Sequence, residues 1–103
     1  EKGEVFVSKD DGMLEGMVGF SREKKELTLL AVHPDCRREG IATRLIYTVA
    51  GCFEPEDEIS VITFAESDPR GEAARACYRS CGFEPEEDLN ISNVECQKLV
   101  YRV

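Results

Sequence analysis

The stretch Val32-His-Pro-Asp-Cys-Arg-Arg-Glu-Gly-Ile-Ala-Thr-Arg-Leu45 decides the fold of this chain of 103 residues. An apolar run from Leu27 to Val32 leads into it and predicts a buried strand, and helical periodicity begins just after it. Between the two lies the segment 37–42, which reads Arg-x-x-Gly-x-Ala. A strand that enters a helix through a glycine turn leaves free backbone N–H groups at the helix N-terminus. Those donors and the positive end of the helix dipole attract phosphate, so the stretch predicts a pyrophosphate site.

The residues that we assign to this pyrophosphate site are Arg37, Arg38, Gly40, Ile41 and Ala42. The arginines add positive charge, the glycine lets the backbone come close to a ligand, and the alanine keeps the first helical turn thin. Glu39 is expected to contribute only its backbone N–H, because its carboxylate would repel phosphate, and Thr43 adds a hydroxyl. The alternative is an ordinary solvated first turn that holds nothing.

The rest of the chain alternates strands and helices. Strands are predicted at residues 4–8, 13–20, 26–32, 58–64, 89–92 and 94–103, and helices at residues 38–53 and 68–81. Asp68 and Pro69 suit the start of the second helix, Gly82 suits its end, and residues 84–88 are predicted to form an acidic loop. The run 27–32 is apolar at nearly every position, which is typical of a central strand buried on both faces. Strand, helix and strand in this order form a parallel crossover, so the sequence predicts one α/β domain, residues 1–103, with a mixed sheet and at least two helices.

Composition limits the partners. The formal net charge is −8, which argues against nucleic acid or an anionic membrane as a partner, and no apolar run is long enough to span a bilayer. The charge suits a cationic acceptor such as an amine, or simply keeps the protein soluble. The five cysteines form no disulfide framework, and with His33 as the single histidine they form no metal motif. We therefore expect reduced thiols, a cytoplasmic protein and no metal.

A second motif lies downstream, Ala73-Ala-Arg-Ala-Cys-Tyr-Arg-Ser-Cys-Gly-Phe83. Together with Arg-x-x-Gly-x-Ala after an apolar strand, it resembles the two conserved blocks of the GCN5-related N-acetyltransferase (GNAT) superfamily, in the family's order and at a plausible separation. The resemblance covers roughly residues 14–103. It implies that acetyl-CoA is a co-substrate and that the acetyl group passes to a primary amine by direct attack in a ternary complex.

The resemblance also implies the acyl-CoA N-acyltransferase fold, a mixed and mostly antiparallel central sheet with flanking helices. In this fold the parallel strands 27–32 and 59–64 splay apart, and the pantetheine arm of CoA bonds to the exposed backbone of the first, here Leu30, Ala31 and Val32. The family's strand and helices ahead of the first recognisable strand have no counterpart in this chain, which begins at Glu1. We expect those N-terminal elements to be missing.

The resemblance makes Tyr78 the expected general acid, since the family carries a tyrosine four residues before the glycine of Gly-Phe. A phenol with a pKa near 10 suits the return of a proton to a thiolate. The alternative is a buried tyrosine whose hydroxyl bonds the backbone. The general base stays open between Glu26, which opens the central strand, and Glu66, which follows the fourth strand. We interpret His33 as structural.

The alternatives to an enzyme are a catalytically inactive CoA-binding or sensor domain and a purely structural domain. The acceptor is either a small-molecule amine or an amine of a protein. The acidic segments 54–58 and 84–88 either attract a cation or are solvated loops. The resemblance also makes a homodimer through the final strand an expected arrangement.

Overall fold

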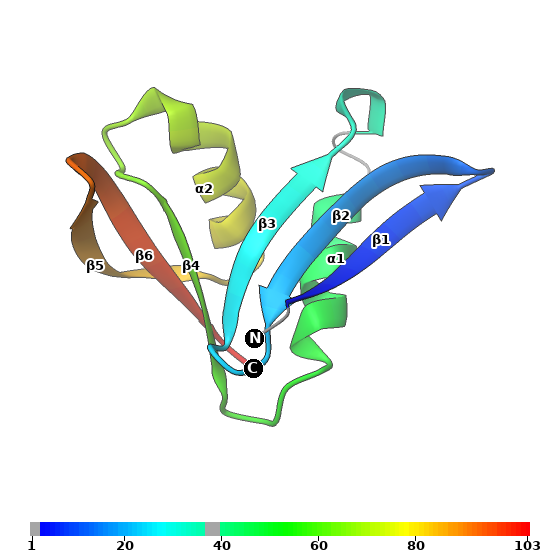
Figure 1. Cartoon of the computed structure of the whole chain (residues 1–103), viewed down its shortest axis with the longest axis horizontal. Coiled ribbons are helices and arrows are strands. Elements are labelled where there is room, and N and C mark those ends of the chain that lie inside the picture. Colours follow the sequence, from blue (N-terminus) through cyan, green and yellow to red (C-terminus); the bar gives the residue numbers. More distant parts are fainter. Residues whose placement is uncertain (1–2, 37–39) are drawn as a thin grey trace.

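A six-stranded mixed sheet with both helices on one face forms the fold (Figure 1). In a computed structural model of the chain, residues 3–36 and 40–103 are described. The strand order in the sheet is β1-β2-β3-β4-β6-β5. The strands are β1 (Glu4–Asp10), β2 (Met13–Ser21), β3 (Glu26–Val32), β4 (Glu58–Phe64), β5 (Glu84–Ile91) and β6 (Val94–Arg102). The helices are α1 (Ile41–Ala50) and α2 (Glu72–Ser80), and each follows a short 3₁₀ turn, η1 (Pro34–Cys36) and η2 (Pro69–Gly71).

The parallel pair β3–β4 is splayed. The two strands share one register position, Glu26 opposite Ser60, and next to it the Ser60 N–H donates to the Lys25 carbonyl at 2.9 Å. All other neighbouring strands pair antiparallel and along their length. Figure 1 shows β3 and β4 meeting at one end and diverging towards the other. The structure therefore confirms the expected fold class, a mostly antiparallel mixed sheet with one splayed parallel pair.

The core lies between the sheet and the two helices. Helix α1 contributes one apolar stripe to the core, formed by Ile41, Leu45, Ile46 and Val49. Strand β4 contributes the alternate residues Ile59 and Val61. The prediction that β3 is buried on both faces was wrong, because Leu29 is 46% exposed. Both helices cover the same face, so alternate residues of β3 point to a face without helices.

Several element boundaries differ from the prediction, and three of the differences affect the argument. Helix α1 ends at Ala50 rather than at residue 53, and the residues expected at its start, 38 and 39, lie outside the described part of the chain. The predicted N-cap Asp68 caps η2 instead of α2, with its carboxylate accepting from the Arg70 N–H at 2.9 Å. The acidic loop predicted at residues 84–88 is the first half of β5. Antiparallel pairing with β6 extends this strand, and as an edge strand it tolerates Pro85 next to a register shift.

The final strand has no free edge. Strand β6 pairs with β4 on one side and with β5 on the other, so β5 is the outer strand of this half of the sheet. The homodimer expected through the final strand stays a prediction, and it would have no unpaired backbone of β6 to use. None of the described helices is both long enough and apolar enough to span a membrane.

One buried arginine ties α2 to the end of β4. The Arg75 guanidinium donates to the backbone carbonyls of Phe64, Ala65, Glu66 and Asp68 at 2.6–3.1 Å. These bonds satisfy a charge that would otherwise be costly to bury. Gly71 lies against the same group, since a Cβ built there would be 2.8 Å from Arg75 Nη1 and 2.9 Å from the Phe64 Cβ. The glycine therefore allows η2 to sit close to β4.

We expect Gly71→Ala to lower the free energy of unfolding by about 1–3 kcal/mol, because the added methyl group must displace the Arg75 guanidinium or the strand. Gly51→Ala is the matched control, since its φ of −64° suits any residue and the nearest atom to a built Cβ is 3.4 Å away. Urea denaturation should show the control unchanged or slightly stabilised. Equal midpoints for the two variants would contradict the tight packing at Gly71.

Candidate functional site

The splay leaves one edge of β3 without a strand partner. The His33 N–H donates to the Glu15 carbonyl at 2.7 Å, on the β2 side. Because amides alternate along an antiparallel ladder, Ala31 also points its amide to β2, whereas Leu30 and Val32 point theirs to the β4 side. Past Glu26 these groups face the gap in which β3 and β4 are unpaired. Leu30 and Val32 can therefore bond an extended ligand, and the Ala31 amide serves the sheet.

The glycine turn lies at the end of the same strand. Gly40 is the N-cap of α1 with a φ of 77°, a left-handed conformation that glycine adopts without strain, and no side chain caps the helix. The first intrahelical bond runs from the Arg44 N–H to the Gly40 carbonyl, so the amides of residues 41–43 begin the helix without an intrahelical acceptor. A Cβ at Gly40 would meet nothing within 4 Å. This geometry is that of an anion site at a helix N-terminus.

Three residues assigned to the pyrophosphate, Arg37, Arg38 and Glu39, lie outside the described residues. Ile41, in contrast, is fixed in the core, because its side chain is only 2% exposed. Its backbone N–H is thus what it can offer to a ligand. The Thr43 hydroxyl accepts a bond from the Cys81 thiol at 3.5 Å, and its own O–H is left to donate, so its role toward a phosphate stays a prediction. That contact joins the first turn of α1 to the end of α2, and it brings the two sequence motifs together.

Helix α2 ends in a glycine motif that fixes Tyr78. Gly82 has a φ of 106°, its N–H donates to the Arg79 carbonyl, and the Phe83 N–H donates to the Tyr78 carbonyl at 3.0 Å. This is the Schellman pattern of bonds, which a glycine after the C-cap makes possible. Phe83 then turns back into the core and packs on Tyr78 with 5.6 Å between ring centroids. The Gly-Phe pair of the second motif therefore holds the tyrosine ring in place.

The Tyr78 side chain is 6% exposed, yet its hydroxyl bonds to none of the residues that the structure describes. The alternative of a phenol bonded to the backbone is thus not what the described residues show. Burial, with a smaller contribution from the Cys77 thiol, raises the pKa of Tyr78 to about 12. The phenol therefore stays protonated and has a free donor for a ligand.

The two candidate bases lie at opposite ends of the splayed pair. Glu26 sits at the closed end, opposite Ser60, whereas Glu66 follows the last residue of β4 at the open end. Arg75 fixes the backbone of Glu66, and Arg79 lies 3.7 Å from its carboxylate. Only Glu66 thus shares the open end with α2, the helix that carries Tyr78.

His33 and the cysteines serve the fold. The His33 Nδ1 accepts from the Asp35 N–H at 3.1 Å, which agrees with the structural interpretation of this residue. None of the five cysteines is in a disulfide bond. Within residues 3–36 and 40–103, no three potential metal ligands come together.

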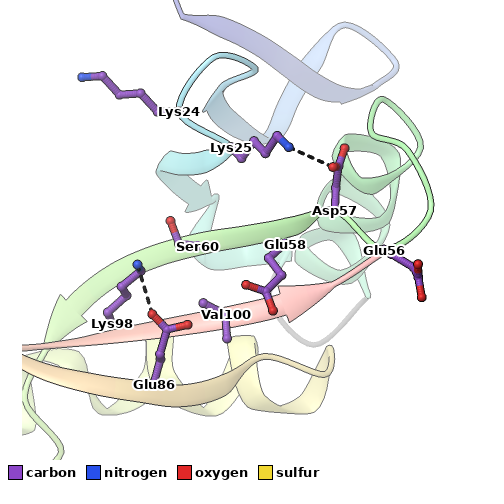
Figure 2. Close-up of a pocket in the computed structure, with 9 residues that line it drawn as sticks. All are labelled: Lys24, Lys25, Glu56, Asp57, Glu58, Ser60, Glu86, Lys98 and Val100. Carbon is purple, nitrogen blue, oxygen red and sulfur yellow. Dashed lines mark hydrogen bonds and ion pairs between the residues drawn. The ribbon is translucent and has the colours of Figure 1, made fainter.

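A pocket lies beside each end of the splayed pair. The first pocket, of about 450 Å³, lies near the closed end and is lined by Ser60 and Val100 among others. In two ion pairs of its lining, Lys25–Asp57 and Lys98–Glu86, the partners neutralise each other's charges (Figure 2). The second, of about 460 Å³, lies beside Glu66 and reaches to the β5–β6 hairpin. Sequence reasoning predicted neither pocket. Sequence reasoning also missed Arg75. The available signal was its position three residues before Tyr78, which puts both side chains on the same face of the helix.

Comparison with known proteins agrees with this geometry. Residues 1–85 match a family model described as an acetyltransferase (GNAT) domain. A search of curated protein sequences finds no significant match.

Several solved structures share the fold. The ribosomal-protein-S18-alanine N-acetyltransferase from Escherichia coli aligns with 100% of this chain and 70% of its own, at 18% identity and a TM-score of 0.76. A GNAT-family acetyltransferase from Bacillus cereus aligns with 95% and 69% of the two chains, at 19% identity and a TM-score of 0.76. Arabidopsis thaliana Naa50, in complex with the bisubstrate analogue CoA-Ac-MVNAL, aligns with 93% and 70%, at 17% identity and a TM-score of 0.73.

Gly40→Asp should abolish acetyl-CoA binding, because a carboxylate would meet the diphosphate at the start of α1. Gly12→Asp is a matched control, since Gly12 also has a positive φ and open space around its built Cβ but lies in the β1–β2 turn. Both variants should lose similar stability from backbone strain. Isothermal titration should show affinity lost only in Gly40→Asp; equal affinity in the two variants would contradict the assignment.

Proposed function

This chain belongs to the acetyltransferase (GNAT) family, and we propose that it moves an acetyl group from acetyl-CoA to a primary amine by direct attack in a ternary complex. The observation that carries the proposal is the splayed pair β3–β4, with an unpaired β3 edge that leads into the uncapped start of α1. An extended chain that ends in a diphosphate suits this combination. It can bond the strand edge and place its phosphates at the helix N-terminus.

Acetyl-CoA is the proposed co-substrate. The backbone amides of Leu30 and Val32 bond its pantetheine arm, beside Ala31, and the segment from Arg37 to Thr43 receives its pyrophosphate. Support comes from the amides of the first turn of α1, which have no intrahelical acceptor, and from the left-handed Gly40, which has open space where a side chain would lie. Naa50 carries a bisubstrate analogue that contains CoA, which supports the same ligand here by analogy.

The chain's residues have three tasks in the transfer. An unpaired amide of β3 stabilises the negative charge that develops on the thioester oxygen as the amine nitrogen bonds to the carbonyl carbon. Tyr78 donates its proton to the sulfur as the carbon–sulfur bond breaks. Glu66, through a water molecule, takes the proton that the ammonium must lose before its nitrogen can attack, and the proton that leaves the nitrogen after the attack replaces the one that Tyr78 gave to the sulfur. Amide and free thiol are thus formed with no covalent enzyme intermediate, and positioning supplies much of the rate.

Glu66 is the proposed base rather than Glu26 because it follows the open end of β4, next to α2. The acceptor is an amine of a small molecule or of a protein, and the net charge of −8 favours its cationic form on approach. The lack of a disulfide among the five cysteines is consistent with a reducing compartment, and we propose the cytoplasm.

Tyr78→Phe should lower kcat by about 100-fold with little change in the Kd of acetyl-CoA, because the lost proton donor acts only as the sulfur leaves. Steady-state assays with an amine acceptor, together with titration of acetyl-CoA, separate the two quantities. An unchanged kcat would remove Tyr78 from the mechanism. If the wild-type protein binds acetyl-CoA and transfers nothing to any amine, the chain is the inactive CoA-binding domain.

The pH dependence gives a second test of the same residue. Since the pKa of Tyr78 is raised to about 12, its acidic form is present at every pH below that value. The phenol should therefore cause no loss of kcat between about pH 7 and about pH 10. A basic limb with an apparent pKa near 9 that is present in the wild type and absent from Tyr78→Phe would contradict the assignment.

A further inference from the structure

The second pocket, which we name the carboxylate pocket, lies between the end of β4 and the β5–β6 hairpin. Its volume of about 460 Å³ is within the range of small-molecule sites. The Ala65 N–H donates to the Glu95 carbonyl at 3.1 Å, so the two walls of the pocket are joined. The lining residues are Ala65, Glu66, Ser67, Asp88, Glu95, Cys96 and Gln97.

The charge of the carboxylate pocket is negative. Three carboxylates line it, and no lysine or arginine does. Glu66 has Arg79 at 3.7 Å, and Glu95 accepts a bond from the neutral Asn90 amide at 3.0 Å, which leaves its charge in place. The Asp88 carboxylate has no ion-pair or hydrogen-bond partner within the described part of the chain. A cation in this pocket would therefore meet uncompensated negative charge.

Gln97 is the second and independent sign of a ligand. Its side chain is only 7% exposed and lines the pocket, yet its amide has no hydrogen-bond partner among the described residues. It lies on the face that Thr63 and Asp88 share, as their direct register partner. Among the described residues no fully buried side-chain nitrogen or oxygen lacks a partner, so the unpaired amide of Gln97 reaches the solvent of the pocket. Its carbonyl oxygen is an acceptor suited to an ammonium group held among carboxylates.

The pocket adjoins the proposed reaction centre. Glu66 belongs to both, as the proposed base and as a wall of the pocket, and its partner Arg79 is the residue next to Tyr78 on α2. Arg75, one helical turn before Arg79, holds the Glu66 carbonyl at 2.8 Å. A molecule with one amine at the reaction centre and a second charge a short chain away could thus reach both.

We propose that the carboxylate pocket binds a second ammonium group of the acceptor, so that the preferred acceptors are linear diamines and longer polyamines. The inference rests on the proposed function. Asp88 and Glu95 attract the distal charge, the Gln97 carbonyl accepts one of its hydrogen bonds, and the walls at Ala65 and Cys96 contact the methylene chain. A monoamine of equal length lacks these interactions and binds more weakly.

Direct binding tests the pocket without any requirement for catalysis. Isothermal titration should show 1,4-diaminobutane bound at least about tenfold more tightly than butylamine, as expected for a charge-assisted bond and a second carboxylate. Asp88→Asn should weaken the affinity for diaminobutane by about threefold. Glu84→Gln removes a charge from the same strand outside the pocket and should leave that affinity unchanged. Equal affinity for the two amines in the wild type would overturn the proposal.

Gln97→Leu separates a binding role from a structural one. Because the amide has no partner, leucine should leave the melting temperature unchanged or raise it, while diaminobutane binding falls by about fivefold. A fall in melting temperature with unchanged diamine affinity would make Gln97 a structural residue and overturn its role here.

Kinetics distinguish this proposal from the proposed function. With acetyl-CoA present, the wild type should have a higher kcat/KM for diaminobutane than for butylamine. Asp88→Asn should lower the kcat/KM for diaminobutane and so reduce this preference, without changing the kcat/KM for butylamine. Equal acetylation of both amines would refute the carboxylate pocket and leave the acetyltransferase intact. Tight diamine binding without transfer to any amine would keep the pocket and refute the acetyltransferase.

Discussion

The site depends on the single register position, Glu26 opposite Ser60, at which β3 and β4 remain paired. A parallel pair that continued beyond it would satisfy its own backbone groups and leave no room between the strands. Because it stops there, the edges of both strands are free where β3 leads to the glycine turn of α1. Buried amides need partners, so such an edge has to meet water or a ligand. The gap in the β3–β4 pairing is thus a consequence of a parallel pair that stops after one register position, and no separate loop is needed to build it.

Because β3 and β4 are unpaired over most of their length, the two halves of the sheet also need contacts through the helices. Arg75 fixes the backbone where β4 ends, through four carbonyl oxygens, and Gly71 allows η2 to lie close enough for those bonds. The Cys81–Thr43 contact then joins α2 to the first turn of α1. Together these contacts place the Tyr78 ring, the glycine turn and the end of β4 in one rigid arrangement. Preorganisation of this kind is what an acyl transfer from a reactive thioester requires.

Local signals predicted much of the fold and part of the site. The apolar run of β3, the stripe of α1 and the glycines at positions 40 and 82 each report on their own neighbourhood, and they correctly placed a strand, a helix, the start of α1 and the end of α2. Burial of β3 on both faces was wrong, because an apolar run does not reveal that both helices lie on one side. The loop predicted at residues 84–88 was wrong because pairing with β6, a long-range contact, overrides the charged composition. Arg75 and Gln97 were missed because their roles also depend on long-range contacts. Arg75 bonds carbonyl oxygens at the end of β4, and Gln97 lines a pocket, and neither surrounding is visible in the local sequence.

The central claim is that the unpaired edge of β3 and the start of α1 bind acetyl-CoA. Its most direct test is a thermal-shift titration of the wild-type protein with acetyl-CoA, with ATP as the anion control. A ligand at roughly 100 times its Kd stabilises the folded state by about 2.7 kcal/mol, which for a domain of this size raises the melting temperature by several degrees. The account predicts that rise with acetyl-CoA and none with ATP. An unchanged melting temperature with acetyl-CoA, or an equal rise with ATP, would contradict it.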